Sequence, residues 1–136
     1  MIAIKLEHIL QINAMVVTKF GGMVMMRDLG RLEAAVATQH QEVFGRELYL
    51  TVFEKAAAML RGIIADHPFV DGNKRTAMLT AMTYLELNGY QFVARIGEIE
   101  DFAVRVATDH LEIDDIATWL KCHSQHSKFA KNQKSA

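Results

Sequence analysis

Proline occurs only once in this chain of 136 residues, at Pro68, and apolar residues follow a helical spacing on both sides of it. Proline interrupts a helix because it lacks an N–H donor and clashes with the preceding turn. The sequence therefore allows long helices on either side of residue 68 and predicts a break beside it. Two segments place apolar residues three and four positions apart, which marks one buried helical face. They are residues 52–64, with Val52, Phe53, Ala56, Ala57, Leu60, Ile63 and Ile64, and residues 73–88, with Met78, Leu79, Met82 and Leu85.

The remainder of the chain is also helical in pattern. A first apolar stripe, which includes the polar Asn13, ends at Gly21-Gly22. Further helices are predicted around residues 32–36, 98–108 and 113–122, and an extended stretch is predicted over residues 90–96. We therefore predict an all-α fold, a compact single-domain bundle of about six helices over residues 1–124. Residues 125–136 are polar, with three lysines and no acids, and we expect a disordered tail there.

Composition and charge exclude several classes of protein. The chain is 51% hydrophobic and 23% charged, which is ordinary for a globular domain. Its formal net charge of -1 gives no reason to expect direct binding of nucleic acid. The single cysteine, Cys122, excludes an intramolecular disulfide, and residues 1–7 lack the pattern of a signal peptide. No run approaches the roughly 18 apolar residues of a membrane span. We expect a cytoplasmic domain that does not contact a membrane.

The loop between the two central helices is dense in functional groups. Within nine positions it concentrates a histidine, a carboxylate, a glycine, an amide and two cations, in the order His67-Pro68-Phe69-Val70-Asp71-Gly72-Asn73-Lys74-Arg75. Gly72 can adopt a positive φ and let the main chain approach a ligand. A helix follows, and its first N–H groups attract anions. Lys74 and Arg75 lie in that first turn, where cations disfavour the helix itself, so they indicate a bound anion such as a phosphate chain.

Two further side chains complete a possible reaction site. A carboxylate beside phosphates usually holds Mg²⁺, and Asp71 has that position. His67 can take a proton from an attacking hydroxyl near neutral pH. Together these groups indicate phosphoryl or nucleotidyl transfer. The alternative is a plain turn in which Asn73 caps the helix and Lys74 and Arg75 are solvated, but a turn gives no reason for cations in the first helical turn.

Residues 67–75 resemble the signature of the Fic/Doc family, in which His-x-Phe-x-Asp/Glu-Gly/Ala-Asn precedes Gly or Lys and then Arg. Three further blocks are similar to the death-on-curing (Doc) branch of that family, at residues 27–35, 53–57 and 85–90. The resemblance covers most of residues 6–120. It implies a compact helical fold with the signature between two central helices.

The resemblance also implies a role for each matching residue. His67 would be the general base toward a protein hydroxyl, and Phe69 would anchor the loop on the core. Asp71 would hold Mg²⁺, and the backbone of Gly72 would contact the phosphates of a nucleotide. The same phosphates would be bound by Asn73, Lys74 and Arg75.

The type of transfer depends on two positions. Members of the family that transfer AMP have glycine where this chain has Lys74, and a second arginine where it has Met78. Both differences are typical of the Doc branch, in which ATP sits reversed and its γ-phosphoryl group is transferred. The resemblance implies a threonine of bacterial elongation factor Tu as the target. The alternatives are an AMP transferase and a catalytically idle binding module with the same fold.

The resemblance implies two partner surfaces. A Phd-type antitoxin would neutralise a Doc-type toxin by folding its C-terminal segment into a groove beside the active site, which predicts an exposed apolar groove on this chain. We interpret Gln41–Leu50, with Gly45 at a bend, as the flap that places the target beside the signature, or else as a surface connector. Residues 23–26, Met-Val-Met-Met, are a further candidate for a covered surface.

One other cluster of potential ligands lies near the C-terminus. Cys122, His123 and His126 could form part of a metal site, but three side chains near an expected tail are weak evidence. We favour a structural or incidental role for them.

Overall fold

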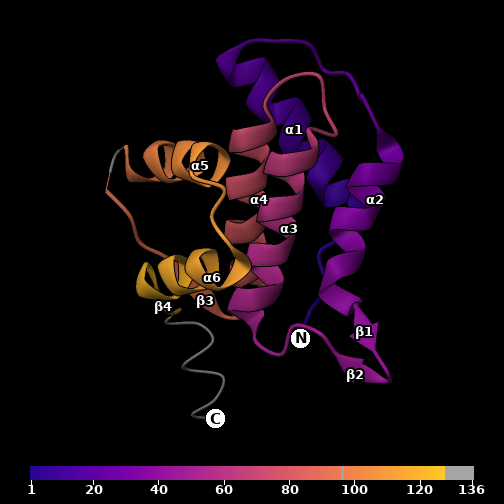
Figure 1. Cartoon of the computed structure of the whole chain (residues 1–136). Coiled ribbons are helices and arrows are strands. Elements are labelled where there is room, and N and C mark those ends of the chain that lie inside the picture. The colour runs from indigo at the N-terminus through magenta and orange to yellow at the C-terminus, as the bar shows by residue number, and fades with distance from the viewer. Residues whose placement is uncertain (96, 128–136) are drawn as a thin grey trace.

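Two antiparallel helices, α3 (Val52–Asp66) and α4 (Asn73–Leu87), run side by side through the centre of the molecule (Figure 1). The computed structural model describes residues 1–95 and 97–127. Helix α3 packs against α2, α4 and α6, and α4 packs against α1 and α5. The outer helices are α1 (Leu6–Phe20), α2 (Leu29–Ala37), α5 (Glu98–Thr108) and α6 (Ile113–Cys122), and a 3-10 turn, Thr38–His40, follows α2. The predicted all-α bundle, with the loop between its two central helices, is confirmed.

The core explains why the loop has fixed ends. Four alanines of the central helices, Ala56, Ala57, Ala77 and Ala81, are fully buried, and such small side chains let neighbouring helices approach closely. Burial of one large apolar side chain contributes about 1.5–3 kcal/mol. Side chains of this kind that are at most 1% exposed include Leu32, Met59, Leu60, Ile63, Met78, Tyr84, Leu85, Ile116 and Leu120. The C-terminal end of α3 and the start of α4 are therefore held together by their own packing.

Four short strands form two separate two-stranded sheets in the described part of the chain. β1 (Glu42–Val43) pairs with β2 (Arg46–Glu47), and β3 (Tyr90–Phe92) pairs with β4 (Ser124–His126), both antiparallel. The β3 strand lies within the predicted extended stretch. The predicted start of the disordered tail is wrong, because Gln125 and His126 lie in β4 opposite Gln91 and Tyr90. Ser127 is described as well, and its N–H donates to the carbonyl of Gly89 at 2.9 Å. Residues 128–136 of the expected tail, and residue 96, lie outside the described residues.

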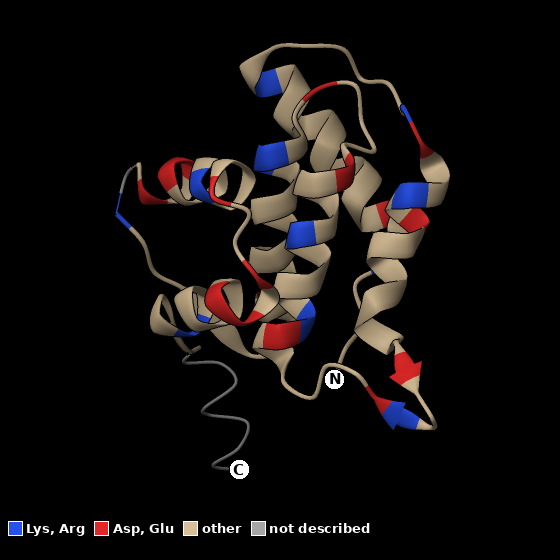
Figure 2. Cartoon of the chain, in the orientation of Figure 1, with Lys and Arg blue, Asp and Glu red and all other residues tan. Residues whose placement is uncertain are grey.

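Charged residues of both signs are spread over the ribbon, and basic residues lie at the ends of α1 and α4 that flank the loop (Figure 2). They are Lys19 on α1 and Lys74 and Arg75 on α4. None of the helices in the described residues has both the length and the apolarity that a membrane span requires. The basic ends matter for the site, because they lie beside the same cavity.

Candidate active site

The loop begins at His67, in a backbone conformation that is unusual for this residue type. His67 has φ 47° and ψ 60°, the left-handed region, and its N–H donates to the carbonyl of Ile63 at 3.2 Å to close α3. A left-handed conformation costs a residue with a side chain about 1–2 kcal/mol, so surrounding contacts must maintain it. The imidazole is exposed, with Nδ1 3.4 Å from the carbonyl oxygen of Ala65. Its side chain lines a cavity of about 360 Å³ between α3 and the end of α5.

The middle of the loop is fastened to the core through Phe69. This side chain is 3% exposed and packs in the hydrophobic core. The Asn73 amide holds the same residue by its backbone: its Oδ1 accepts from the N–H of Phe69 at 3.0 Å, and its Nδ2 donates to the carbonyl of Phe69 at 2.8 Å. Asn73 is buried, so its side chain shapes the loop. The phosphate contact expected for Asn73 stays a prediction.

Asp71 is half-buried and offers one oxygen to a ligand. Its Oδ2 accepts a hydrogen bond from the N–H of Met23 at 2.8 Å. Its backbone carbonyl accepts from Nδ2 of Asn13 at 3.0 Å. Oδ1 has no hydrogen bond with the described residues. In the same residues, no group of three or more histidine, cysteine or acidic side chains is placed to hold a metal. One open carboxylate oxygen fits Mg²⁺, which is commonly held by one or two carboxylates together with substrate phosphates and water.

Gly72 begins α4 without a side-chain cap, and its φ is 79°. A Cβ at this position would lie 3.2 Å from methyl carbons of both Val16 and Val17, so packing against α1 also requires glycine. The first N–H with a helical acceptor is that of Thr76, which donates to the carbonyl of Gly72 at 2.9 Å. The preceding N–H groups of the first turn are therefore open to an anion.

Lys74 and Arg75 line a second cavity, of about 420 Å³, between α1, α4 and α5. The Arg75 guanidinium lies over the ring of Phe20, with Cζ 4.1 Å from the ring centroid. The cavity walls are mostly apolar, with Met15, Val16, Met78, Leu79, Ile99, Ala103 and Val104 among them. This cavity matches the apolar groove that we predicted beside the site.

The segment beside the loop is Gly21–Asp28, and the interpretation of Gln41–Leu50 as the flap is wrong. The β1–β2 hairpin lies at the start of α3, where Glu47 pairs with Lys55 at 3.1 Å, at the opposite end of that helix from the loop (Figure 1). In Gly21–Asp28, by contrast, Met26 forms an antiparallel bridge with Phe69, and Val70 N–H donates to the carbonyl of Met25 at 3.0 Å.

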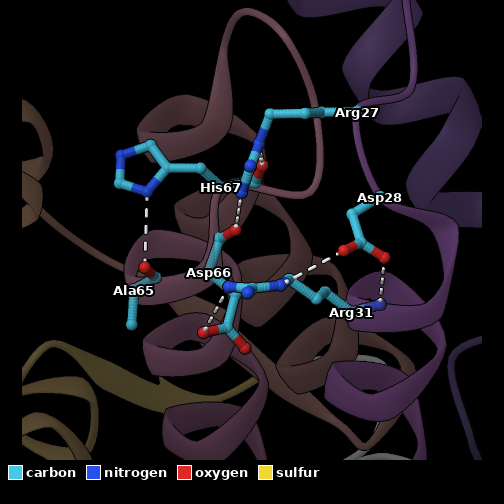
Figure 3. Close-up of polar contacts among 6 residues, drawn as sticks. All are labelled: Arg27, Asp28, Arg31, Ala65, Asp66 and His67. Atoms are coloured by element: carbon cyan, nitrogen blue, oxygen red, sulfur yellow. Dashed lines mark hydrogen bonds and ion pairs between the residues drawn. The ribbon is translucent and has the colours of Figure 1, made fainter.

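Three residues that position the loop were not identified from the sequence. Asn13, 1% exposed, donates to the carbonyl of Asp71 and to Oγ1 of Thr76, and its only signal was a polar residue on an apolar stripe. A Cβ on Gly22 would lie 2.8 Å from Cβ of Asp71. Arg27 donates to the carbonyls of Asp66 and His67 (Figure 3). Gly22 and Arg27 lie in a connecting segment, where the residue types alone do not indicate contacts with a distant loop.

The histidines near the C-terminus have structural contacts. Nε2 of His123 lies 2.9 Å from Oε2 of Glu98, and its ring stacks on Trp119 with centroids 4.0 Å apart. His126 stacks on Tyr90 with centroids 4.8 Å apart. These contacts support the structural role that we favoured over a metal site for this cluster.

The fold and the loop together define a small helical protein whose two central helices are joined by a loop that leads into an uncapped helix start with two cations. The model of the Fic/DOC family matches residues 3–85. The chain is 43% identical over 103 residues to the toxin Doc of Mycolicibacterium smegmatis, which covers 74% of this chain and 79% of that protein. It is also 31% identical over 115 residues to the protein kinase doc of Escherichia phage P1. That match covers 85% of this chain and 90% of the phage protein. The chain therefore belongs to the Fic/DOC family, which confirms the resemblance.

Proposed function

We propose that this chain is a Doc-type toxin, a phosphotransferase that moves the γ-phosphoryl group of ATP to a threonine hydroxyl of another protein. The observation that carries this proposal is the start of α4, which has no side-chain cap and has Lys74 and Arg75 in its first turn beside the half-buried Asp71. The relative from phage P1 is named a protein kinase, and the one from M. smegmatis a toxin. By family resemblance the target is elongation factor Tu in the bacterial cytoplasm.

The proposed step is an in-line displacement at the γ-phosphorus. His67 accepts the proton of the threonine Oγ, a bond forms between Oγ and the γ-phosphorus, and the bond from that phosphorus to the bridging oxygen breaks. The electron pair of the broken bond stays on ADP, which leaves. Lys74, Arg75 and the open N–H groups of α4 stabilise the negative charge of the transferred group. Asp71 would hold Mg²⁺, whose charge supports the same stabilisation.

Gly21–Asp28 is the segment proposed to guide the target to His67. Its inner side bonds to the loop, and Met23, Val24 and Met25 are each more than half exposed. An extended segment with exposed apolar residues can receive a partner chain as an added strand. This assignment gives the flap function to the segment that contacts the loop in place of Gln41–Leu50.

The cavity lined by Lys74 and Arg75 is proposed as the site of a Phd-type antitoxin. Its apolar walls suit one face of an amphipathic segment, and the two cations at its edge suit an acidic side chain on that segment. A segment bound there would cover both cations and so prevent them from contacting phosphates.

Intact-mass spectrometry of elongation factor Tu tests the proposed reaction. The target is incubated with ATP, Mg²⁺ and either the wild-type chain, His67→Ala or His110→Ala. His110 is a matched control because it also lies just beyond a helix in a left-handed conformation, with φ 48°. We expect a gain of about 80 Da with the wild type and the control, and none with His67→Ala. A gain of about 329 Da indicates AMP transfer instead, and an unchanged mass in every arm indicates a binding module.

A further inference from the structure

Arg27 joins the Gly21–Asp28 segment to the end of α3 (Figure 3). Its Nε donates to the carbonyl of His67 at 2.6 Å, and its Nη2 donates to the carbonyl of Asp66 at 2.5 Å. Carbonyls at the C-terminal end of a helix have no partner inside the helix. The guanidinium of Arg27 therefore satisfies two neighbouring carbonyls at the point where the chain leaves α3.

The backbone beside Arg27 holds the next carbonyl as well. The N–H groups of Arg27 and Asp28 both donate to the carbonyl of Pro68, at 2.7 and 2.9 Å. Three consecutive carbonyls, those of Asp66, His67 and Pro68, are thus held by two adjacent residues of one segment. A strained backbone conformation persists when its surroundings determine it in several ways at once. These contacts supply that condition for the left-handed His67.

The contacts of Arg27 differ from those of a surface ion pair. The carboxylates of Asp28 and Asp66 are both paired with Arg31, at 3.2 and 3.6 Å (Figure 3). Arg27 itself makes no salt bridge with the described residues. Its planar fork carries two parallel donors, which a lysine ammonium cannot present in the same geometry. The choice of arginine at this position therefore follows from the two backbone carbonyls.

We propose that Arg27 is a positioning residue for His67. By holding the carbonyls on either side of the Cα of His67, it fixes the backbone from which the imidazole projects and so sets the direction of the proposed base. Arg27 has no contact with the reacting atoms in this role. The effect on catalysis rests on the proposed function, whereas the effect on the orientation of His67 does not.

Nuclear magnetic resonance of the imidazole groups tests the orientation directly. The resonances of His67 are assigned by their loss in His67→Ala and are then compared in the wild type, Arg27→Ala and Arg31→Ala. Arg31→Ala is the matched control. Arg31 carries the same charge and pairs with Asp28 and Asp66, but it donates to none of the carbonyls that Arg27 holds. We expect Arg27→Ala to shift or broaden the His67 resonances and Arg31→Ala to leave them in place. Unchanged His67 resonances in Arg27→Ala, or equal shifts in both variants, would overturn the proposal.

Chemical rescue separates positioning from a general loss of stability. Added guanidinium ion at millimolar concentration can occupy the space left in Arg27→Ala, and we expect it to return the His67 resonances toward their wild-type positions. Methylammonium, which lacks the planar fork, serves as the control cation. If Arg27→Ala fails to fold, Arg27→Lys takes its place, because a lysine keeps the charge but lacks the planar fork with its two parallel donors. Wild-type His67 resonances in folded Arg27→Lys contradict the proposal.

The transfer reaction gives the functional readout. In Arg27→Ala we expect kcat to fall about 100-fold, as for a catalytic group displaced by about 1 Å, with the KM for ATP unchanged. A raised KM at unchanged kcat would assign Arg27 to substrate binding and overturn the positioning role. If the wild type shows no transfer at all, the proposed function fails, and the resonances of His67 still decide the role of Arg27.

Discussion

Helices α4 and α5 begin in the same way but carry opposite charges. Each follows a left-handed glycine, Gly72 with φ 79° and Gly97 with φ 91°, and neither has a side-chain cap. The first turn of α5 contains Glu98, Glu100 and Asp101, the sign that the positive end of a helix dipole favours. The first turn of α4 contains no acid and carries Lys74 and Arg75.

This difference separates the requirements of folding from those of binding. Because the glycine caps are alike, backbone geometry does not account for the cations of α4. The start of α5 carries acidic residues, which are the residues that stabilise the first turn of a helix. Both first turns contribute to one cavity, with Lys74 and Arg75 on one wall and Ile99 and Glu100 on another. The cations of α4 therefore support a bound anion, which is the ligand of the proposed reaction.

The largest expected difference between the two helix starts is in catalysis. Replacing either Lys74 or Arg75 with alanine should lower the rate of phosphoryl transfer about 100- to 1000-fold, since each removes a group that stabilises the transferred charge. Asp101→Ala, in the matching turn of α5, should change the rate less than about twofold, because Asp101 is exposed and does not line the cavity that Lys74 and Arg75 line. Initial rates of target phosphorylation provide the measurement. Equal losses at the two helix starts would refute the distinction.

The two glycines should differ in their effect on stability. Gly97→Ala requires only that alanine adopt a left-handed conformation, at about 1–2 kcal/mol, because no heavy atom of the described residues, chain neighbours aside, lies within 4 Å of the added Cβ. Gly72→Ala adds contacts of 3.2 Å with Val16 and Val17, which should cost about 1–3 kcal/mol more by overpacking. Urea unfolding of both variants measures the difference. If Gly72→Ala is as stable as Gly97→Ala, α1 must shift enough to relieve the contacts of the added Cβ with Val16 and Val17.

Most of the helices could be predicted from the sequence because their buried faces are local patterns. The stripe in residues 52–64 and the break at Pro68 predicted α3 and its end, and the structure places that helix at Val52–Asp66. The signature also located the loop, since all its residues lie within nine positions. Both predictions depend only on neighbours in the chain.

The contacts between distant segments could not be predicted in the same way. Gln41–Leu50 and Gly21–Asp28 are both connecting segments that contain glycine, and nothing local shows which one lies against the loop. That outcome depends on how α1 packs against α4, including the contact of Val16 and Val17 with Gly72. The roles of Asn13 and Arg27 depend on the same packing, because their partners, three backbone carbonyls and the hydroxyl of Thr76, lie more than 35 residues away. Because every residue has a backbone carbonyl, a hydrogen bond to that carbonyl does not require a particular residue type at the partner position.

Reversing one charge in the first turn of each helix should show how much the cations of α4 lower the free energy of unfolding. In phosphate-free buffer we expect Lys74→Glu to raise the free energy of unfolding by about 0.3–1 kcal/mol, because an acid suits the first turn. Glu100→Lys at the start of α5 should lower it by a similar amount. Urea unfolding with and without ATP extends the test, since ATP should stabilise the wild type and not Lys74→Glu. Destabilisation by Lys74→Glu without ligand would contradict the comparison.

The smallest expected effect concerns the pH dependence of the α5 start. The pKa of Glu98 is lowered, first by the hydrogen bond that its carboxylate accepts from the N–H of Arg95 at 2.7 Å and then by the one with His123 at 2.9 Å. A carboxylate whose pKa is lower in the folded state contributes stability above its unfolded pKa, and this contribution is lost as pH falls through the folded pKa. The wild type should therefore be more stable than Glu98→Gln near pH 7, and the difference should shrink below about pH 4.

Glu100→Gln is the matched control for this measurement. Glu100 lies in the same turn, but it is exposed and makes no hydrogen bond or ion pair with the described residues. Its replacement should give urea midpoints that follow the wild type across the pH range, apart from the small loss of helix-dipole stabilisation. If Glu98→Gln and Glu100→Gln show the same pH dependence, the acids of α5 act only through the dipole. The start of α5 would then differ from that of α4 in charge alone, and the contacts of Glu98 with the Arg95 N–H and with His123 would contribute nothing that depends on pH.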